Sequence, residues 1–311
     1  MTTQDQVLPD SVKGRSLWDD AFRRFKANRA AMISLIVLVF VAAFAIFGNY
    51  LTQWDYETVD WFALEDVEFY GKPAMTHPNE YAAEIGTAPH YFGTDSDGRD
   101  LLARLVQGSR ISLMVGLMGA LVAVVIGTIY GAVSGYMGGK VDSLMMRAVE
   151  ILMSFPFMFL VIVLMAIFGR NVLLIFIAIG AVSWLDMARI VRGQTLSLKN
   201  KEFVEAAIAQ GVRTPVIIMR HIVPNVLGVV VVYATLLVPQ MILFESFISF
   251  LGLGVSEPQT SWGALISAGA DSMRITPWQL IFPLLALTIT LFCFNFVGDG
   301  LRDALDPKNK K

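Results

Sequence analysis

Long uncharged apolar stretches divide this chain, and they restrict its fold more than any other feature. The apolar core of a bilayer is about 30 Å thick, and an α-helix needs roughly 20 residues to cross it. Six stretches reach or approach that length: 30–53, 111–139, 151–169, 171–185, 223–244 and 277–297. The fourth becomes long enough only if Asp186 lies near one membrane face. We therefore predict an all-α protein with six transmembrane helices.

Composition supports a protein whose surface faces lipid. Of the 311 residues, 55% are hydrophobic and only 16% are charged, whereas a soluble domain carries about 25% charged residues. The net charge of −2 provides no broad basic field of the kind that attracts nucleic acid. The single cysteine, Cys293, has no partner within the chain for a disulfide or a metal site.

The distribution of Lys and Arg predicts the orientation of these helices. Bases are frequent in 1–29, in 189–221 and at the C-terminus, whereas 252–276 contains only Arg274. Short loops rich in Lys and Arg remain on the cytoplasmic side. Six spans with both termini in the cytosol satisfy this pattern, and an odd number of spans does not.

A polar loop between the fourth and fifth predicted spans, residues 201–225, has the pattern of a helical hairpin. Residues 202–210 favour a helix. Gly211 then suits a left-handed helix stop, and Thr214 followed by Pro215 suits an N-cap and a first helical position. Pro224 lies close to the start of the next span. A hairpin held between two spans can transmit rigid-body motion.

Small side chains mark the first helix of this hairpin. Ala206 and Ala207 present almost no side chain, so a groove on a partner protein can close tightly over them. Glu205 adds a charge beside them. We therefore expect these residues to form a docking face for a separate protein.

The run Glu205-Ala206-Ala207, followed by Gly211 and Pro224, resembles the EAA loop of bacterial ABC importer permeases. Further stretches resemble the C-type permease subunits of oligopeptide importers, in the peptide/nickel branch, over nearly the whole chain. These stretches are Phe92–Asp95, Gly98–Asp100, Gly108–Leu113, Ser154–Pro156, His221–Asn225 and Phe250–Gly254. The resemblance is weakest at 1–14 and 57–88.

This resemblance implies a MetI-like type I importer fold in the bacterial cytoplasmic (inner) membrane. The implied units are a cytosolic tail with an interfacial helix (1–29), a first transmembrane helix (30–53), a periplasmic segment (54–108), a five-helix core (109–300) with the coupling loop 189–224, and a cytosolic tail (301–311). The implied coupling residues are Glu205, Ala206, Ala207, Gly211, Pro215 and Pro224.

The resemblance also implies the partners. They are a second, B-type permease subunit, two cytosolic ABC ATPases and a periplasmic or lipid-anchored peptide-binding protein, together with membrane lipids and a peptide substrate. No cofactor is expected in this chain, because ATP and magnesium would bind to the ATPases. No nucleic acid is expected.

Two acidic residues near the apolar spans are candidates for a translocation path or gate. Glu245 interrupts an apolar run, and charged residues inside a membrane usually face a cavity or a partner. The alternative places Glu245 at the outer headgroups. Asp186 stands three residues before Arg189, so an interfacial ion pair is the alternative to a gate contact.

Enzyme signatures fail when their full patterns are tested. Residues 135–140 resemble a phosphate-binding loop, but Ser134 and Val141 replace the Gly and the Ser or Thr that the pattern requires. The histidines lack metal-ligand spacing. A membrane hydrolase is therefore disfavoured. A dipeptide or nickel importer subunit and a secondary transporter remain as alternatives, although the chain lacks the internal repeat typical of the latter.

Overall fold

Helices account for the regular structure of the chain. The computed structural model describes residues 17–61, 73, 88–168 and 172–305. In chain order its elements are α1 (Leu17–Ala27), α2 (Arg29–Phe47), the 3-10 turn η1 (Gly48–Leu51), α5 (Leu101–Met137), α6 (Gly139–Ser154), α7 (Phe157–Phe168), α8 (Val172–Leu198), α9 (Glu202–Ala209), α10 (Thr214–Ile217), the π-helical turn η2 (Ile218–Ile222), α11 (Val223–Phe250), α12 (Trp262–Asp271) and α13 (Pro277–Leu305). Among the described residues, the β-structure is limited to isolated bridges. The all-α prediction is confirmed.

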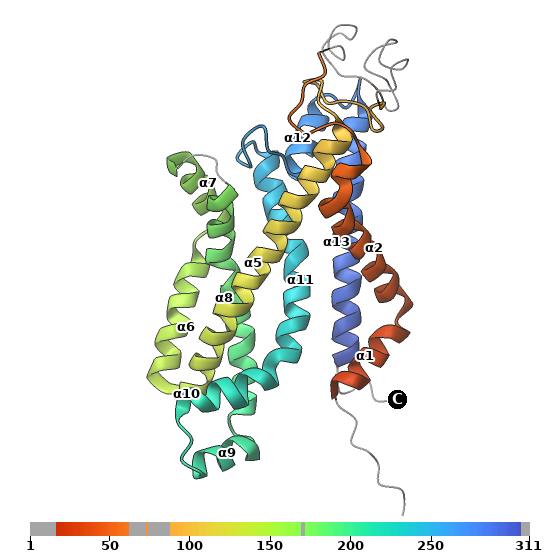
Figure 1. The fold of residues 1–311 in the computed structure, drawn as a ribbon. Coiled ribbons are helices and arrows are strands. Elements are labelled where there is room, and N and C mark those ends of the chain that lie inside the picture. Colours follow the sequence, from red (N-terminus) through yellow and green to blue (C-terminus); the bar gives the residue numbers. More distant parts are fainter. Residues whose placement is uncertain (1–16, 62–72, 74–87, 169–171, 306–311) are drawn as a thin grey trace, which may run out of the picture.

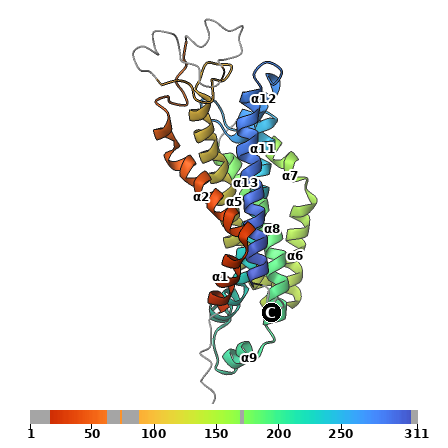
Figure 2. The ribbon, with the colours of Figure 1, turned by 90° about the vertical axis from the view of Figure 1, so that its right-hand side faces the viewer.

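The long helices run side by side along an elongated bundle (Figures 1 and 2). The short helices α9 and α10 lie at one end of it, together with α1 and the C-terminal end of α13 (Figure 1). The opposite end carries α12 and the start of α5. The hairpin and the two ends of the described chain therefore share one side of the bundle.

Four helical runs are long and apolar enough to cross a membrane: Arg29–Leu51, Leu101–Met137, Thr214–Phe250 and Pro277–Leu305. A fifth span results if α6 and α7, which are bent by 72°, count as one. The bend follows from Pro156, because a proline disfavours helical backbone at the residue before it, and Phe155 is extended. The fourth predicted span, 171–185, falls on α8, which is not among these runs, so the count of six stays a prediction.

The second span begins at Leu101, earlier than the predicted residue 111. Asp100 caps this helix, since its Oδ1 accepts a hydrogen bond from the Ala103 amide at 2.7 Å. The charge of Arg104, inside the first turns, is balanced by Glu257 at 3.1 Å and by Asp95 at 3.1 Å. These ion pairs let α5 extend beyond the uncharged stretch that defined the prediction.

A ridge of small residues on α5 packs directly against the backbone of α8. A Cβ atom at Gly127 would lie 2.7 Å from the Trp184 carbonyl oxygen, and one at Gly135 would lie 2.8 Å from that of Arg192. At Gly131 it would lie 2.9 Å from the Arg192 amide nitrogen. Real Cβ atoms essentially never come within 3.0 Å of such atoms. The four-residue spacing of small residues therefore brings the two backbones together, as it does in other membrane helices.

Replacing Gly131 by Ala should destabilise this contact, because the neighbouring atoms are α8 backbone and cannot rotate away. We expect the free energy of unfolding to fall by about 1–3 kcal/mol, measured as a lower thermal midpoint of the detergent-solubilised protein. Gly193→Ala is the matched control, since a Cβ there meets nothing within 4 Å. Equal midpoints for the two variants would contradict the close packing.

A buried histidine joins the segment before α5 to the start of that helix. The His90 side chain is 0% exposed and stacks on Trp54, with ring centroids 4.3 Å apart. Its Nδ1 lies 2.9 Å from Asp100 Oδ2, and its Nε2 lies 3.1 Å from Asp60 Oδ2. Burial by itself lowers the pKa of His90, but the hydrogen bonds with Asp100 and Asp60 outweigh it and raise the pKa above its usual value.

This arrangement predicts a pH-dependent stability. A raised folded-state pKa contributes stability that is complete below the unfolded pKa of about 6.5 and is lost as the pH rises through the folded value. The thermal midpoint should therefore fall as the pH rises above about 6.5, and His90→Gln should flatten this fall. His221→Gln is the control. An unchanged slope in His90→Gln would show that His90 does not cause it.

Candidate functional site

The predicted hairpin is present at residues 202–217 and is closed by a Schellman motif. At the end of α9, the Val212 amide donates to the Ala207 carbonyl at 3.1 Å, and the Gly211 amide donates to the Ile208 carbonyl at 2.9 Å. This pair of bonds defines the motif. Gly211 has φ +74°, a backbone conformation that costs a residue with a Cβ about 1–2 kcal/mol. The predicted left-handed stop at Gly211 is confirmed.

The two alanines of the predicted docking face point in different directions. Ala206 is exposed, whereas Ala207 is buried in the core cluster with Val204 and Ile217. Val204 and Ala207 are three residues apart and therefore share a helix face, which turns inward toward α10. The expectation that Ala207 lies on the docking face is wrong for this reason. Its small side chain instead lets α9 pack closely against α10, which is the second arm of the hairpin.

Two large apolar side chains on α9 that the sequence reasoning did not select are exposed. Phe203 is 38% exposed and Ile208 is 53% exposed, beside the exposed Glu205 and Ala206. Apolar side chains that protrude from a polar loop are the signal that could have identified them. With Glu202 and Ala209, the exposed surface of α9 thus combines two acidic, two small and two apolar side chains.

The second arm of the hairpin continues into a span without a break. We expected Thr214 as the N-cap and Pro215 as the first helical residue, but Arg213 is the N-cap, so the helix begins one residue earlier. From Thr214 the chain stays helical to Phe250 through the π turn η2. Pro224 lies in the first turn of α11, where its missing N–H fits the irregular hydrogen bonding of a π turn.

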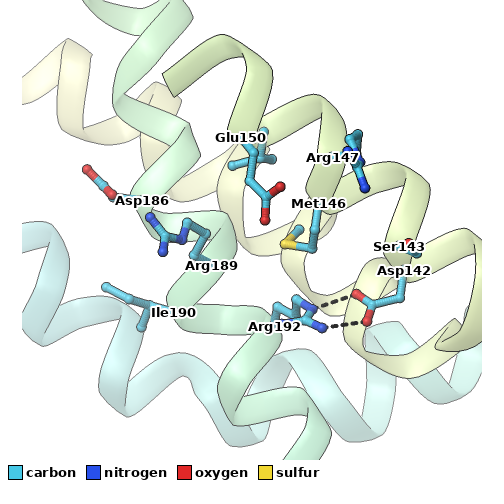
Figure 3. A pocket seen from close by; sticks show the side chains of 10 residues that line it. Asp142, Ser143, Met146, Arg147, Glu150, Asp186, Arg189, Ile190 and Arg192 are labelled. Atoms are coloured by element: carbon cyan, nitrogen blue, oxygen red, sulfur yellow. Dashed lines mark hydrogen bonds and ion pairs between the residues drawn. The ribbon is translucent and has the colours of Figure 1, made fainter. Parts of the chain in front are cut away.

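A cavity of about 690 Å³ lies between α6 and α8 (Figure 3). Arg147 and Glu150 contribute to it from α6, and Asp186 and Arg189 contribute from α8. All four side chains are exposed in the isolated chain. Asp186, a predicted gate residue, therefore lies in a cavity whose other three charges the sequence reasoning did not select as site residues. The signal that could have identified them is the spacing, because Arg147 and Glu150, like Asp186 and Arg189, are charged residues three positions apart on one helix.

The expected ion pair between Asp186 and Arg189 does not form in the structure, which describes both residues. The Arg189 guanidinium instead lies 3.5 Å from the Met153 sulfur. At the edge of the cavity, Arg192 forms a bidentate pair with Asp142, with both N–O distances 2.6 Å (Figure 3). Ser134 of α5 also donates to Asp142, at 2.5 Å. This pair ties α8 to α6 and closes one side of the cavity.

The other candidate path residue, Glu245, is fully buried near the opposite end of the bundle. Ser112 of α5 donates to its Oε2 at 2.9 Å, and Ser249 donates to its Oε1 at 2.6 Å. Ser112 also accepts a hydrogen bond from the Trp262 amide of α12 at 3.1 Å. Glu245 thus connects α11 to α5 and α12, and its role in a translocation path stays a prediction.

The family model described as "Binding-protein-dependent transport system inner membrane component" matches residues 123–311. The chain belongs to this family. A second model, "N-terminal TM domain of oligopeptide transport permease C", matches residues 16–67. The hairpin, the cavity and Glu245 all fall within the first match, and α1 and α2 fall within the second.

Similar proteins span almost the whole of this family member. An Escherichia coli (strain K12) protein named "Oligopeptide transport system permease protein OppC" is 66% identical over 96% of this chain and 94% of its own length. A Haemophilus influenzae protein of the same name is 58% identical over 98% and 93%. A Bacillus subtilis "Dipeptide transport system permease protein DppC" is 42% identical over 97% and 90%. The predicted family and its peptide branch are confirmed.

Substitution at Gly211 should test whether the Schellman motif holds the hairpin together. Gly211→Val places a β-branched residue at positive φ, so we expect faster hydrogen exchange of the α9 amides, by about tenfold or more. Gly211→Asn is the matched control, because asparagine tolerates this conformation. Equal exchange in Gly211→Val and the parent protein would show that the positive φ does not limit the motif.

Proposed function

We propose that this chain is a permease subunit of an ATP-driven importer and that α9 is the element by which separate ATPases move it. The observation that carries this proposal is the continuity of the second hairpin arm with α11. A protein that binds the exposed face of α9 would act on a helix that runs from Thr214 to Phe250. Movement at the hairpin would therefore reach the membrane span without passing through a flexible linker.

The proposed assembly contains a second permease subunit, two cytosolic ATPases and an external peptide-binding protein. The ATPases would hold ATP and magnesium, and their closure would pull α9 and tilt the attached spans from inward-open to outward-open. Such a switch is a two-state change biased by contacts at one end. We further propose six spans, with the fourth in α8, and both termini in the cytosol on the side of the hairpin.

Oligopeptides are the proposed substrate, because the relatives with the highest identity among those described carry that name in full. A dipeptide is the second candidate, favoured by more distant relatives such as the Bacillus subtilis protein. Because the Ala207 side chain is buried within the hairpin, it cannot contact an ATPase. The proposed contacts with an ATPase are therefore Glu205, Ala206, Phe203 and Ile208. Gly211, Pro215 and Pro224 would hold the hairpin and its connection to α11.

Replacing Ala206 by Arg should weaken ATPase docking, since a long charged side chain would separate surfaces that close over a methyl group. We expect co-purification of the ATPases to fall by at least about tenfold, with the second permease subunit still bound. Ala27→Arg is the matched control, at an exposed alanine on the same end of the bundle. Normal ATPase recovery with Ala206→Arg would refute docking at α9.

A further inference from the structure

The α6–α8 cavity contains four charged side chains of both signs that do not pair with one another. Its bases are Arg147 and Arg189, and its acids are Glu150 and Asp186. The one ion pair at its wall, Asp142 with Arg192, involves neither the two bases nor the two acids. We call Arg147, Glu150, Asp186 and Arg189 the charge quartet. Together with the Asp142–Arg192 pair, the quartet gives the cavity no net charge.

Glu150 and Asp186 lie away from the helix ends that are nearest the hairpin. Glu150 is about 16 Å along α6 from Gly139, and Asp186 is about 18 Å along α8 from Leu198, at 1.5 Å per residue. A charged side chain that faced lipid would be costly, so such residues usually face water-filled cavities or partners. The apolar side chains Leu144, Ile151 and Leu152 of α6 are exposed outside the cavity lining. These residues form an apolar outer surface of α6, while the quartet lines the cavity.

We propose that this cavity is a charge-balanced station on the peptide path, an inference that rests on the proposed function. The two acids would receive a peptide's ammonium groups, and the two arginines would receive its carboxylates through charge-assisted hydrogen bonds. A volume of about 690 Å³ falls within the range of small-molecule sites. The lack of net charge makes the station equally tolerant of acidic, neutral and basic peptides.

A peptide fits this cavity better than a permanent protein contact does. If the second permease subunit filled it, four charges would leave water at a desolvation cost that only fixed, matched partners could offset. A path that opens to water keeps these groups hydrated between passages. The presence of both signs within one cavity also matches a substrate that carries both an ammonium and a carboxylate.

The test removes charge of one sign at a time and measures selectivity. The complete transporter, with saturating binding protein, would be reconstituted in liposomes and supplied with alanine tripeptides carrying Ala, Lys or Glu at the middle position. Arg147→Gln with Arg189→Gln leaves the lining acidic, so the Lys-to-Glu uptake ratio should rise about fivefold. Glu150→Gln with Asp186→Asn leaves the lining basic, so the ratio should fall about fivefold.

The control variant is Arg29→Gln with Arg302→Gln, which removes two exposed bases outside the cavity. Its uptake ratio should not change. Opposite shifts in the two cavity variants, with subunit recovery intact, support the proposal. An unchanged ratio, a uniform loss for all three peptides, or loss of the second permease subunit would overturn it. Normal uptake of the alanine peptide with an unchanged ratio would leave the proposed function standing, so the two failures are distinguishable.

Discussion

The backbone contact between α5 and α8 is the interaction on which the positions of the other elements depend. Its glycines let two long helices approach until one helix touches the main chain of the other. The chain then turns at Gly138 and Gly139, both at positive φ, and α6 returns beside α8. The cavity between α6 and α8 and the pair of Asp142 with Arg192 therefore take their positions from the glycine contact.

Polar contacts hold the two ends of the bundle, whereas apolar packing holds its middle. At one end, Asp142 joins three helices through Ser134 and Arg192. At the other end, Glu245 joins α11 to α5 through Ser112, and His90 joins the preceding segment to Asp100. Hydrogen bonds are stronger in a low-dielectric interior and costly to leave unmade there, so these contacts specify which helices meet at each end.

The helical class, the hairpin and the Gly211 stop followed from local patterns in the sequence, because apolar length and a glycine after a helix are signals within one segment. The direction of Ala207 did not, since it depends on how α9 packs against α10, and that is a tertiary contact. The start of α5 was misplaced because Arg104 finds an acidic partner, Glu257, that is far away in the chain. The cavity was missed for the same reason, as its charges come from two helices.

The π turn η2 gives the run from Thr214 to Phe250 the shape of a crank, with α10 lying across the end of the bundle and α11 rising from it (Figure 1). The long arm measures about 42 Å at 1.5 Å per residue. A tilt of about 5° about its base would displace its far end by about 4 Å, which exceeds the length of a hydrogen bond. Glu245 lies near that far end. A tilt too small to disturb the base of α11 would therefore be enough to break the hydrogen bond between Glu245 and Ser112.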